Sequence, residues 1–427
     1  MVEARILKGF RDSLPLDEIR REEMISKIKS VFSSFGYAPI DTPCLEYEDV
    51  LLSKSAGETE KQIYSFEDNG KRKVALRFDL TVPFARFVAM YAHKNIELPF
   101  KRYHIAKVWR GEKSQHGRYR EFYQCDVDTV GSDSFKSDAE IIEVIISALT
   151  KLNVGSFEMH ISHRGILKAL LESLNLSDKQ TEILRLLDKI DKIGKEGVEK
   201  ELLELLGDTS AIDKLLKFAS FKEKGDKLSD IDFIKNSLNL ENTDALLSLK
   251  NIYESLSYDA KKHIVIDFSI TRGLDYYTGF VFETFLTDVK GVGSISSGGR
   301  YDNLTGLFMK EKITGVGGSI GLDRLISALD TSDSNVKGTS DLYVVPEKGI
   351  SVDVEFIKRI RENGLRVDVA PSEKKNNQVY RYAEVNHIPY VLFYSDGSFM
   401  LKTITTRKEE KFTSLMDVEK RLILCEI

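Results

Sequence analysis

The sequence predicts an α+β protein made of three pieces. From about residue 168 to 258 the chain is rich in Leu, Lys, Glu and Asp and has an apolar period near 3.6, which predicts an all-helical segment. Strand patterns lie on both sides of this segment, so it interrupts a β-rich domain. After residue 340, strand and helix patterns alternate, which predicts a small α/β domain.

Each expected element follows from its residue pattern. Residues 17–35 form one apolar stripe that ends before Gly36, and 138–149 are almost continuously apolar, so both predict helices. The strands expected in the β-rich domain are 74–78, 101–110, 121–130, 263–270 and 279–286. The C-terminal domain is expected to hold the strands DLYVV, LRVDVA and PYVLFY, helices at 351–363 and 376–387, and a hairpin at Asp396-Gly397 before SFMLKTI.

These patterns give expected domain boundaries. The β-rich domain consists of residues 1–167 and 259–330, the helical insertion of residues 168–258, and the C-terminal α/β domain of residues 341–427. The small polar stretch 331–340 (TSDSNVKGTS) has the composition of a linker.

Composition excludes several classes of protein. The 427 residues include 62 Lys and Arg and 67 Asp and Glu, for a net charge of −5, so a general basic coat for nucleic acid is excluded and no DNA partner is expected. Nowhere does an apolar run approach the ~18 residues of a membrane span, and the first ten residues lack a signal-peptide core. We therefore expect a soluble, cytoplasmic protein without a membrane partner. Three scattered cysteines argue against a disulfide framework.

A basic segment followed by a polar strand is the most informative feature. Residues 101–120 contain seven basic residues and one acidic residue, Glu112, a local charge of +6. A charge run alone is more often a solvated hairpin. In the strand 121–130, however, period 2 places Phe122, Gln124, Asp126 and Asp128 on one face and apolar residues on the other. That polar face could bind an anion such as a triphosphate, an aromatic base, and an amino or imidazole group.

Two further segments carry groups that suit a ligand. Asp79 and Thr81 precede Pro83, which we expect to end regular structure, and on an extended segment they would share a face and receive an ammonium group. An Asp-x-Thr before Pro is also common in simple turns and caps. The stretch Thr271–Gly279 combines an arginine, two tyrosines and two glycines, which suits a lip over a ligand, although a hairpin with exposed aromatics has the same composition.

The glycine-rich stretch 315–325 does not encode a dinucleotide site. Its G-x-G-x-x-G register fails at Ile320, and no clear strand is predicted before it. A P-loop motif is absent from the sequence as well. A helix starting near Gly321 would carry Arg324 in its first turn, where the side chain could reach a phosphate.

Together these stretches strongly resemble the histidyl-tRNA synthetases, a family of class II aminoacyl-tRNA synthetases. The resemblance covers nearly the whole chain and starts at Gly9–Asp12. Segments similar to the three class II motifs are Gly36-Tyr37…Pro43, Val108–Phe122 and Gly315–Arg324. Two segments resemble histidine-specific signatures, namely Arg272–Gly279 and Gly298–Asp302.

This resemblance implies a fold and an activity. The implied fold is an antiparallel-sheet class II synthetase catalytic domain with a helical insertion that contacts the tRNA acceptor arm, followed by an anticodon-binding domain. The implied activity joins L-histidine to ATP as an adenylate, with release of pyrophosphate, and then transfers histidine to the 3′ end of tRNA(His). A homodimer and Mg²⁺ are implied as well, although the sequence shows no dedicated Mg²⁺ ligands.

Site residues are carried over position by position. The histidine-binding residues are expected to be Asp79, Leu80, Thr81, Gln124, Asp128, Arg272, Tyr276, Tyr277 and Tyr301. Among them, Asp79, Thr81 and Gln124 would hold the α-ammonium group, and Asp128 with the tyrosines would pair with the imidazole. The ATP-binding residues are expected to be Arg110, Glu112, Arg118, Phe122 and Arg324. Arg110 and Arg272 would be catalytic through contacts with the α-phosphate.

Two other functions are possible for such a sequence, and the sequence also suggests a branch of the family. The main rival is the synthetase-like regulatory subunit of ATP phosphoribosyltransferase, which resembles the catalytic domain and does not charge tRNA. A synthetase for another amino acid is disfavoured by Asp128 and the Tyr276-Tyr277 pair. Asp79 and Asp128 stand where many bacterial members carry Glu, which, with the sequence LRFDLTVPFARF, suggests the eukaryote- and archaeon-like branch.

Overall fold

The computed structural model describes residues 1–52, 62–115, 117–187, 189–270, 277–289, 291–303, 305–329 and 337–423. Its chain forms two compact units, one of Met1–Arg11 with Ile25–Leu329 and one of Asp12–Met24 with Asp330–Ile427. Each unit is built on its own sheet, and the predicted α+β fold class is confirmed. Within the described residues, no helix is both long and apolar enough to cross a membrane.

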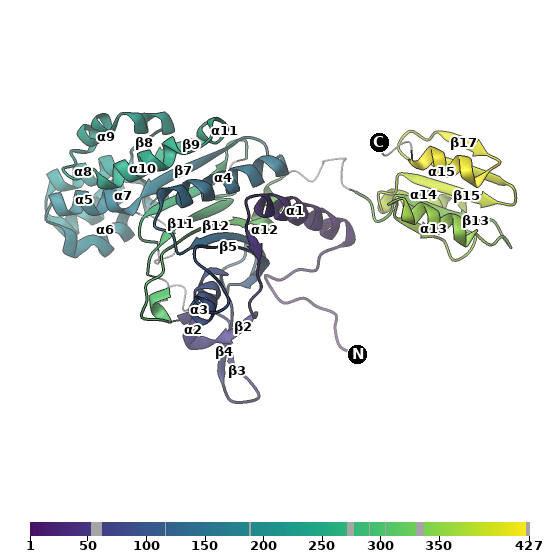
Figure 1. Ribbon diagram of the computed structural model, residues 1–427, viewed down its shortest axis with the longest axis horizontal. Helices are drawn as coiled ribbons and strands as arrows, with labels where there is room; N and C mark the ends of the chain where they lie inside the picture. The colour runs from purple at the N-terminus through teal and green to yellow at the C-terminus, as the bar shows by residue number, and fades with distance from the viewer. Residues whose placement is uncertain are drawn as a thin grey trace. The chain divides into compact units, whose positions relative to one another are not determined.

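The first unit is built on a nine-stranded sheet in the order β1-β5-β6-β12-β11-β10-β7-β9-β8 (Figure 1). Its strands are β1 (Ala38–Pro39), β5 (Phe100–Trp109), β6 (Glu121–Val130), β7 (Phe157–His163), β8 (Lys222–Lys224), β9 (Ile264–Asp267), β10 (Phe280–Leu286), β11 (Ser296–Tyr301) and β12 (Gly315–Gly321). Neighbouring strands are antiparallel except for the β1–β5 and β7–β9 pairs. Strands predicted at 101–110, 121–130 and 279–286 are confirmed.

Period 2 along β6 sorts its side chains between two faces. Cys125 and Val127 are fully buried, and the register pairs Val127 with Gly318 of β12. A Cβ atom at Gly318 would meet Ile141 of helix α4 (Phe135–Leu152), so α4 covers this face. Gln124, Asp126 and Asp128 therefore point to the opposite face, which leaves them available for a site.

Helix α3 (Thr81–Tyr91) corrects one expectation. Thr81 was expected on an extended segment ended by Pro83, whereas Pro83 lies in the first turn of α3 and is buried. Proline fits there because the first helical N–H groups have no intrahelical acceptor, so its missing N–H breaks no bond. Asp79 supports this start by accepting a bond from the backbone N–H of Val82 at 3.1 Å.

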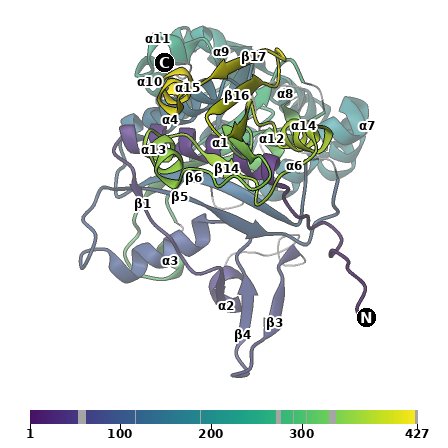
Figure 2. The ribbon, with the colours of Figure 1, turned by 90° about the vertical axis from the view of Figure 1, so that its right-hand side faces the viewer.

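A three-stranded sheet adjoins α3. Its order is β2-β4-β3, with β2 (Leu45–Tyr47), β3 (Ser65–Glu67) and β4 (Lys73–Leu76), and the predicted strand at 74–78 corresponds to β4. The β3–β4 hairpin and the short helix α2 (Glu48–Leu52) project together from the unit (Figures 1 and 2).

The segment between β7 and β9 is almost entirely helical. Its α-helices are α5 (Arg164–Ser173), α6 (Gln180–Leu187), α7 (Ile190–Leu206), α8 (Thr209–Ala219), α9 (Ile231–Leu238), α10 (Asp244–Glu254) and α11 (Tyr258–Lys261). The exception is β8, which adds an edge strand to the large sheet beside β9. Its sequence Lys-Glu-Lys has no apolar alternation, so the strand could not be predicted.

The second unit has a five-stranded sheet in the order β14-β13-β15-β16-β17. Its elements are β13 (Leu342–Pro346), α13 (Val354–Glu362), β14 (Val367–Val369), α14 (Asn376–Val385), β15 (Tyr390–Ser395), β16 (Ser398–Thr403), β17 (Glu409–Phe412) and α15 (Leu415–Ile423). Leu342 and Val344 pack with α13 and α15, whereas Tyr343 and Val345 pack with α14. Alternate residues of β13 thus fill two cores. The sequence predicted every element of this unit except β17 and α15.

Candidate active site

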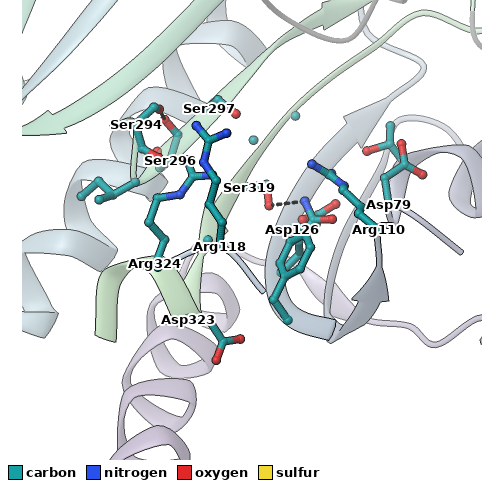
Figure 3. Close-up of a pocket in the computed structure, with 18 of the residues that line it drawn as sticks. Asp79, Arg110, Arg118, Asp126, Ser294, Ser296, Ser297, Ser319, Asp323 and Arg324 are labelled. Carbon is teal, nitrogen blue, oxygen red and sulfur yellow. Dashed lines mark hydrogen bonds between the residues drawn. The ribbon is translucent and has the colours of Figure 1, made fainter. Parts of the chain in front are cut away.

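A cavity of about 260 Å³ opens on the polar face of β6 and β12 (Figure 3). It brings together most of the predicted site residues, although they come from five separate segments of the chain. The predicted residues that line it are Asp79, Thr81, Arg110, Glu112, Arg118, Phe122, Gln124, Asp128, Tyr277, Tyr301 and Arg324. The cavity therefore joins the basic segment, the polar strand and the start of α12 (Leu322–Ala328) in one site.

One predicted residue in the described part of the chain does not line it. Leu80 is fully buried at the N-cap of α3, where its side chain belongs to the core and its carbonyl accepts a hydrogen bond from Arg102. Its predicted role in histidine binding therefore has no side-chain contact to support it. Arg272 and Tyr276 lie outside the described residues.

Two arginines line one end of the cavity, and a third lies farther along it. Figure 3 shows Arg118 and Arg324 next to Ser294, Ser296 and Ser297, with Arg110 farther along, near Asp79. Arg324 donates to the carbonyl of Ser294. Burial lowers the pKa of Arg324, and the positive charges of Arg118 and Arg110 lower it further. Like charges gathered in this way make the end of the cavity a receptor for a polyanion.

Arg110 is held by the backbone and stays close to an aromatic ring. Its Nε donates to the carbonyl of Phe78 at 2.9 Å, and its Cζ lies 5.2 Å from the centroid of the Phe122 ring. The nearest oxygen of Glu112 is 4.0 Å from Nη1 of Arg110. Phe122 thus offers a stacking surface directly beside the positive charge.

The start of α12 is fixed by contacts that sequence reasoning missed. Oδ2 of Asp323 accepts from the backbone N–H of Tyr123 at 2.6 Å, and Oδ1 of Asp323 pairs with Arg11. Arg11 also lies 3.9 Å from the centroid of the Tyr119 ring. A carboxylate in the first helical turn is favourable, and here it holds the turn that carries Arg324 against β6.

Carboxylates line the other end. The hydroxyl of Tyr301 donates to Oδ1 of Asp128 at 2.7 Å, and Nη2 of Arg102 lies 2.8 Å from Oδ2 of Asp128. Burial raises the pKa of Asp128, and the charge of Arg102 and the bond from Tyr301 oppose this rise. Arg102 itself is fully buried below the cavity.

Asp79 and Gln124 each leave an acceptor unused. Oδ1 of Asp79 is bonded to Val82, and Nε2 of Gln124 donates to Oγ of Ser319 at 3.0 Å. Oδ2 of Asp79 and Oε1 of Gln124 are buried and have no hydrogen-bond partner in the part of the chain that the structure describes. Burial raises the pKa of Asp79 to about 6, and Arg110 is among the charges that oppose the rise.

Asp126 belongs to the same group, although no role was assigned to it. It lines the cavity between Gln124 and Asp128, and among the described residues its buried Oδ1 has no partner. Burial raises its pKa to about 7, with a smaller upward contribution from Asp128. The alternation along β6 already placed Asp126 on this face, so the strand pattern could have identified it.

The arrangement defines what can bind. Buried acceptors without partners are costly, and a ligand with N–H donors at this end would satisfy Asp79, Gln124 and Asp126. The other end presents guanidinium groups to a polyanion. A cavity of this kind, on the face of a mainly antiparallel sheet and bounded by a strand, an arginine-bearing loop and a following helix, defines a class II aminoacyl-tRNA synthetase catalytic domain.

Comparison with known proteins gives the family. Residues 9–325 match the histidyl-tRNA synthetase family. A histidine–tRNA ligase of Treponema denticola is 46% identical over 99% of this chain and 98% of its own, and one of Rhodopirellula baltica is 44% identical over 96% and 95%. A histidyl-tRNA synthetase structure from Nostoc sp. PCC 7120 has a TM-score of 0.85 at 27% identity and covers 99% of both chains. The chain belongs to the histidyl-tRNA synthetase family.

The expected place of the chain within the family is not borne out. Treponema and Rhodopirellula are bacteria, so the shorter carboxylates Asp79 and Asp128 do not mark a eukaryote- or archaeon-like branch. A Bacillus halodurans structure described as an ATP phosphoribosyltransferase regulatory subunit/histidyl-tRNA synthetase has a TM-score of 0.76 at 24% identity, which shows a shared fold only.

Proposed function

We propose that this chain is a histidine–tRNA ligase, which activates L-histidine with ATP and transfers it to the 3′ end of tRNA(His). The observation that carries the proposal is the polarity of the cavity, with Arg118 and Arg324 at one end, buried acceptors at the other, and Arg110 beside those acceptors. An aminoacyl-adenylate matches this arrangement. Its phosphate is negatively charged and suits the arginines, and the amino acid beside the phosphate carries an ammonium group that suits the acceptors.

The acceptor end fits histidine. Oδ2 of Asp79 and Oε1 of Gln124 would accept from the α-ammonium group, with Thr81 beside them on the cavity wall. Asp128, already bonded to Tyr301, would accept from an imidazole N–H, and Tyr277 lines the same end. Two ring nitrogens need two partners, and a site built to bond them rejects analogues by about 10⁴–10⁵.

The arginine end fits ATP. Phe122 would stack on adenine, and Glu112 would lie near its edge. Arg110 would contact the α-phosphate together with Arg272, which lies outside the described residues, and Arg118 and Arg324 would hold the β- and γ-phosphates. This assignment follows their order along the cavity, because Arg110 is the arginine nearest Asp79.

The proposed reaction needs no protein nucleophile. A carboxylate oxygen of histidine attacks the α-phosphorus, the bond to the bridging oxygen breaks, and pyrophosphate leaves. In the second step the terminal ribose hydroxyl of the tRNA attacks the carbonyl carbon of the adenylate, and AMP leaves with its phosphate oxygen. Positioning and stabilisation of the developing negative charge by fixed arginines account for catalysis.

Mg²⁺ is part of the proposal because it would neutralise phosphate charge. Phosphate and carboxylate oxygens suit a hard cation of this kind. Such ions are commonly held by one or two carboxylates together with substrate phosphates. We therefore expect Mg²⁺ to be held mainly by the phosphate oxygens, since the described residues contain no group of three or more His, Cys, Asp or Glu side chains that could hold a metal ion.

Several wider assignments belong to the same proposal. The helical insertion (168–258) would contact the acceptor arm of the tRNA, and the C-terminal domain (341–427), joined by the linker 331–340, would bind the anticodon. A homodimer in the cytoplasm is proposed as well. Large apolar side chains that are more than a third exposed support a dimer interface on the small sheet and α3, and they are Leu45, Tyr47, Phe66 and Met90.

Two outcomes of one assay separate this function from its rivals. Histidine-dependent exchange of labelled pyrophosphate into ATP, followed by charging of a tRNA(His) transcript, is expected with the purified chain. A regulatory subunit would give neither activity, and a synthetase for another amino acid would give exchange with that amino acid alone. Either result would reject the proposed function.

A further inference from the structure

The acceptor end of the cavity rests on a guanidinium group that does not line it. Arg102 of β5 is fully buried, and its Nη2 lies 2.8 Å from Oδ2 of Asp128. The register pairs Arg102 with Asp128 directly across β5 and β6, so their side chains share a face of the sheet. The ion pair is thus fixed by the sheet and not by a flexible loop.

Arg102 makes a second contact in the other half of the same subsite. Its Nη2 also donates to the carbonyl of Leu80 at 3.2 Å, and its Cζ lies 4.3 Å from the centroid of the Phe84 ring on α3. Leu80 is the residue between Asp79 and Thr81. One guanidinium therefore joins the strand that carries Asp128 to the turn that carries the proposed ammonium-binding residues.

The charge of Arg102 acts on all three buried carboxylates. Burial raises the pKa of Asp79, Asp126 and Asp128, and Arg102 opposes the rise at each of them. An ionised carboxylate can only accept hydrogen bonds, whereas a protonated one can also donate. By opposing protonation, Arg102 favours the form of Asp128 that requires a hydrogen-bond donor, such as an N–H group, from its ligand.

Arg77 shows how a structural arginine is bonded in this fold. It is also buried, and it donates from Nε to the carbonyl of Lys107 at 3.0 Å and from Nη1 to the carbonyl of Thr42 at 2.6 Å. By contrast, Nε and Nη1 of Arg102 have no hydrogen-bond partner among the residues that the structure describes. Unpaired buried donors cost stability, so fold stability alone does not explain Arg102.

We propose that Arg102 is a positioning residue that sets amino-acid specificity, because it fixes an ionised Asp128 at a set distance from the Asp79–Thr81 turn. The side chain bound there must then present a hydrogen-bond donor to Asp128, as the imidazole N–H of histidine does. This inference rests on the proposed function, since it assigns Asp128 to the imidazole.

The test compares Arg102→Met with Arg77→Met in amino-acid-dependent pyrophosphate exchange. For Arg102→Met, kcat/KM for histidine is expected to fall by about 30-fold or more, as when one partner of a buried charge pair is truncated. The KM for ATP is expected to stay unchanged. The ratio of kcat/KM for histidine to that for 2-thienylalanine, whose ring has no N–H, is expected to fall as well. Arg77→Met is expected to lower Tm and leave this ratio unchanged.

A double-mutant cycle with Asp128→Asn shows whether Arg102 acts through Asp128. If it does, Arg102→Met adds little to the loss of histidine specificity in the Asp128→Asn background. Independent, additive effects, or an unchanged histidine-to-thienylalanine ratio in Arg102→Met, would overturn the inference. If Arg102→Met does not fold, Arg102→Lys, which keeps the charge, is measured in the same assays. The histidine-to-thienylalanine ratio of kcat/KM is then expected to fall by less. If pyrophosphate exchange by the wild type does not depend on histidine, the proposed function itself is rejected.

Discussion

Gly317 of β12 lies against Asp128 of β6 so closely that a Cβ atom at position 317 would be 2.0 Å from Oδ1 of Asp128. The glycine is therefore required by the carboxylate and not by a turn. Gly298 of β11 is similar, because its Cβ would lie 2.2 Å from the carbonyl oxygen of Gly317. The glycine-rich stretch is a central strand whose missing side chains make room for the acceptor end of the cavity.

Gly317→Ala is expected to displace the Asp128 carboxylate and lower kcat/KM for histidine by about 10²-fold, the effect of a misplacement near 1 Å. The KM for ATP should change little, because Arg118 and Arg324 lie at the other end of the cavity. Gly306→Ala is the control, since its Cβ would meet only Lys312 Cγ at 4.0 Å. Equal losses in the two alanine variants, measured by pyrophosphate exchange, would contradict the proposed crowding.

Asp128→Asn is expected to weaken histidine far more than ATP. The amide keeps the shape but has one oxygen and one NH₂ group, so either Tyr301 or Arg102 meets a donor where it now meets an oxygen. Loss of a charged hydrogen bond of about 1.5–3 kcal/mol corresponds to roughly a 10- to 150-fold rise in the KM for histidine. Exchange kinetics with each substrate varied in turn measure both constants, and equal changes in both would rule out an imidazole contact.

Arg324→Ala is expected to act mainly on the chemical step. Removal of one preorganised charge stabiliser typically lowers kcat by about 10²–10³. Because Arg324 also donates to the carbonyl of Ser294, Arg324→Lys separates charge from geometry and should recover part of the loss. Pre-steady-state adenylate formation is the measurement. A normal rate in Arg324→Ala would remove this residue from phosphate binding.

Asp126→Asn is expected to change how stability depends on pH. Burial raises the folded-state pKa of Asp126 to about 7, from about 3.8 for an ordinary aspartate. The folded protein therefore holds an extra proton between these values, and its stability falls as the pH rises through 7. The variant lacks this loss, so its Tm should exceed that of the wild type at pH 8, by about 2–4 °C for each kcal/mol removed, and match it near pH 4.

The control for this prediction is Asp213→Asn, which changes an exposed carboxylate on α8 by the same substitution. The difference in Tm between pH 4 and pH 8 should be the same in Asp213→Asn as in the wild type. If the plot of Tm against pH for Asp126→Asn runs parallel to the wild-type plot across this range, Asp126 does not carry the proton.

Local patterns predicted the site wherever one strand set the geometry. Alternation along β6 was enough to place Phe122, Gln124 and Asp128 on one face, because a strand leaves no other choice. It also placed Asp126 there, and only its role was missed. The start of α12 was predicted for a similar reason, since Arg324 falls in the first turn after a glycine run.

Other parts depended on contacts that no local pattern contains. The helix at Thr81–Tyr91 was missed because Pro83 was interpreted as a terminator, whereas it stands in a first turn that needs no N–H from it. Strand β12 was missed because glycine has low strand propensity, and its reason lies in Asp128, almost two hundred residues away in sequence. Asp323 and Arg11 likewise meet only in the folded chain.

The two ends of the cavity are tested most directly by a crystal structure of the chain with histidine and a non-hydrolysable ATP analogue. We expect phosphate oxygens within hydrogen-bond distance of Arg110, Arg118 and Arg324, and an imidazole N–H bonded to Asp128. A nucleotide bound away from these arginines, or a histidine side chain that leaves Asp128 without a contact, would contradict this expectation.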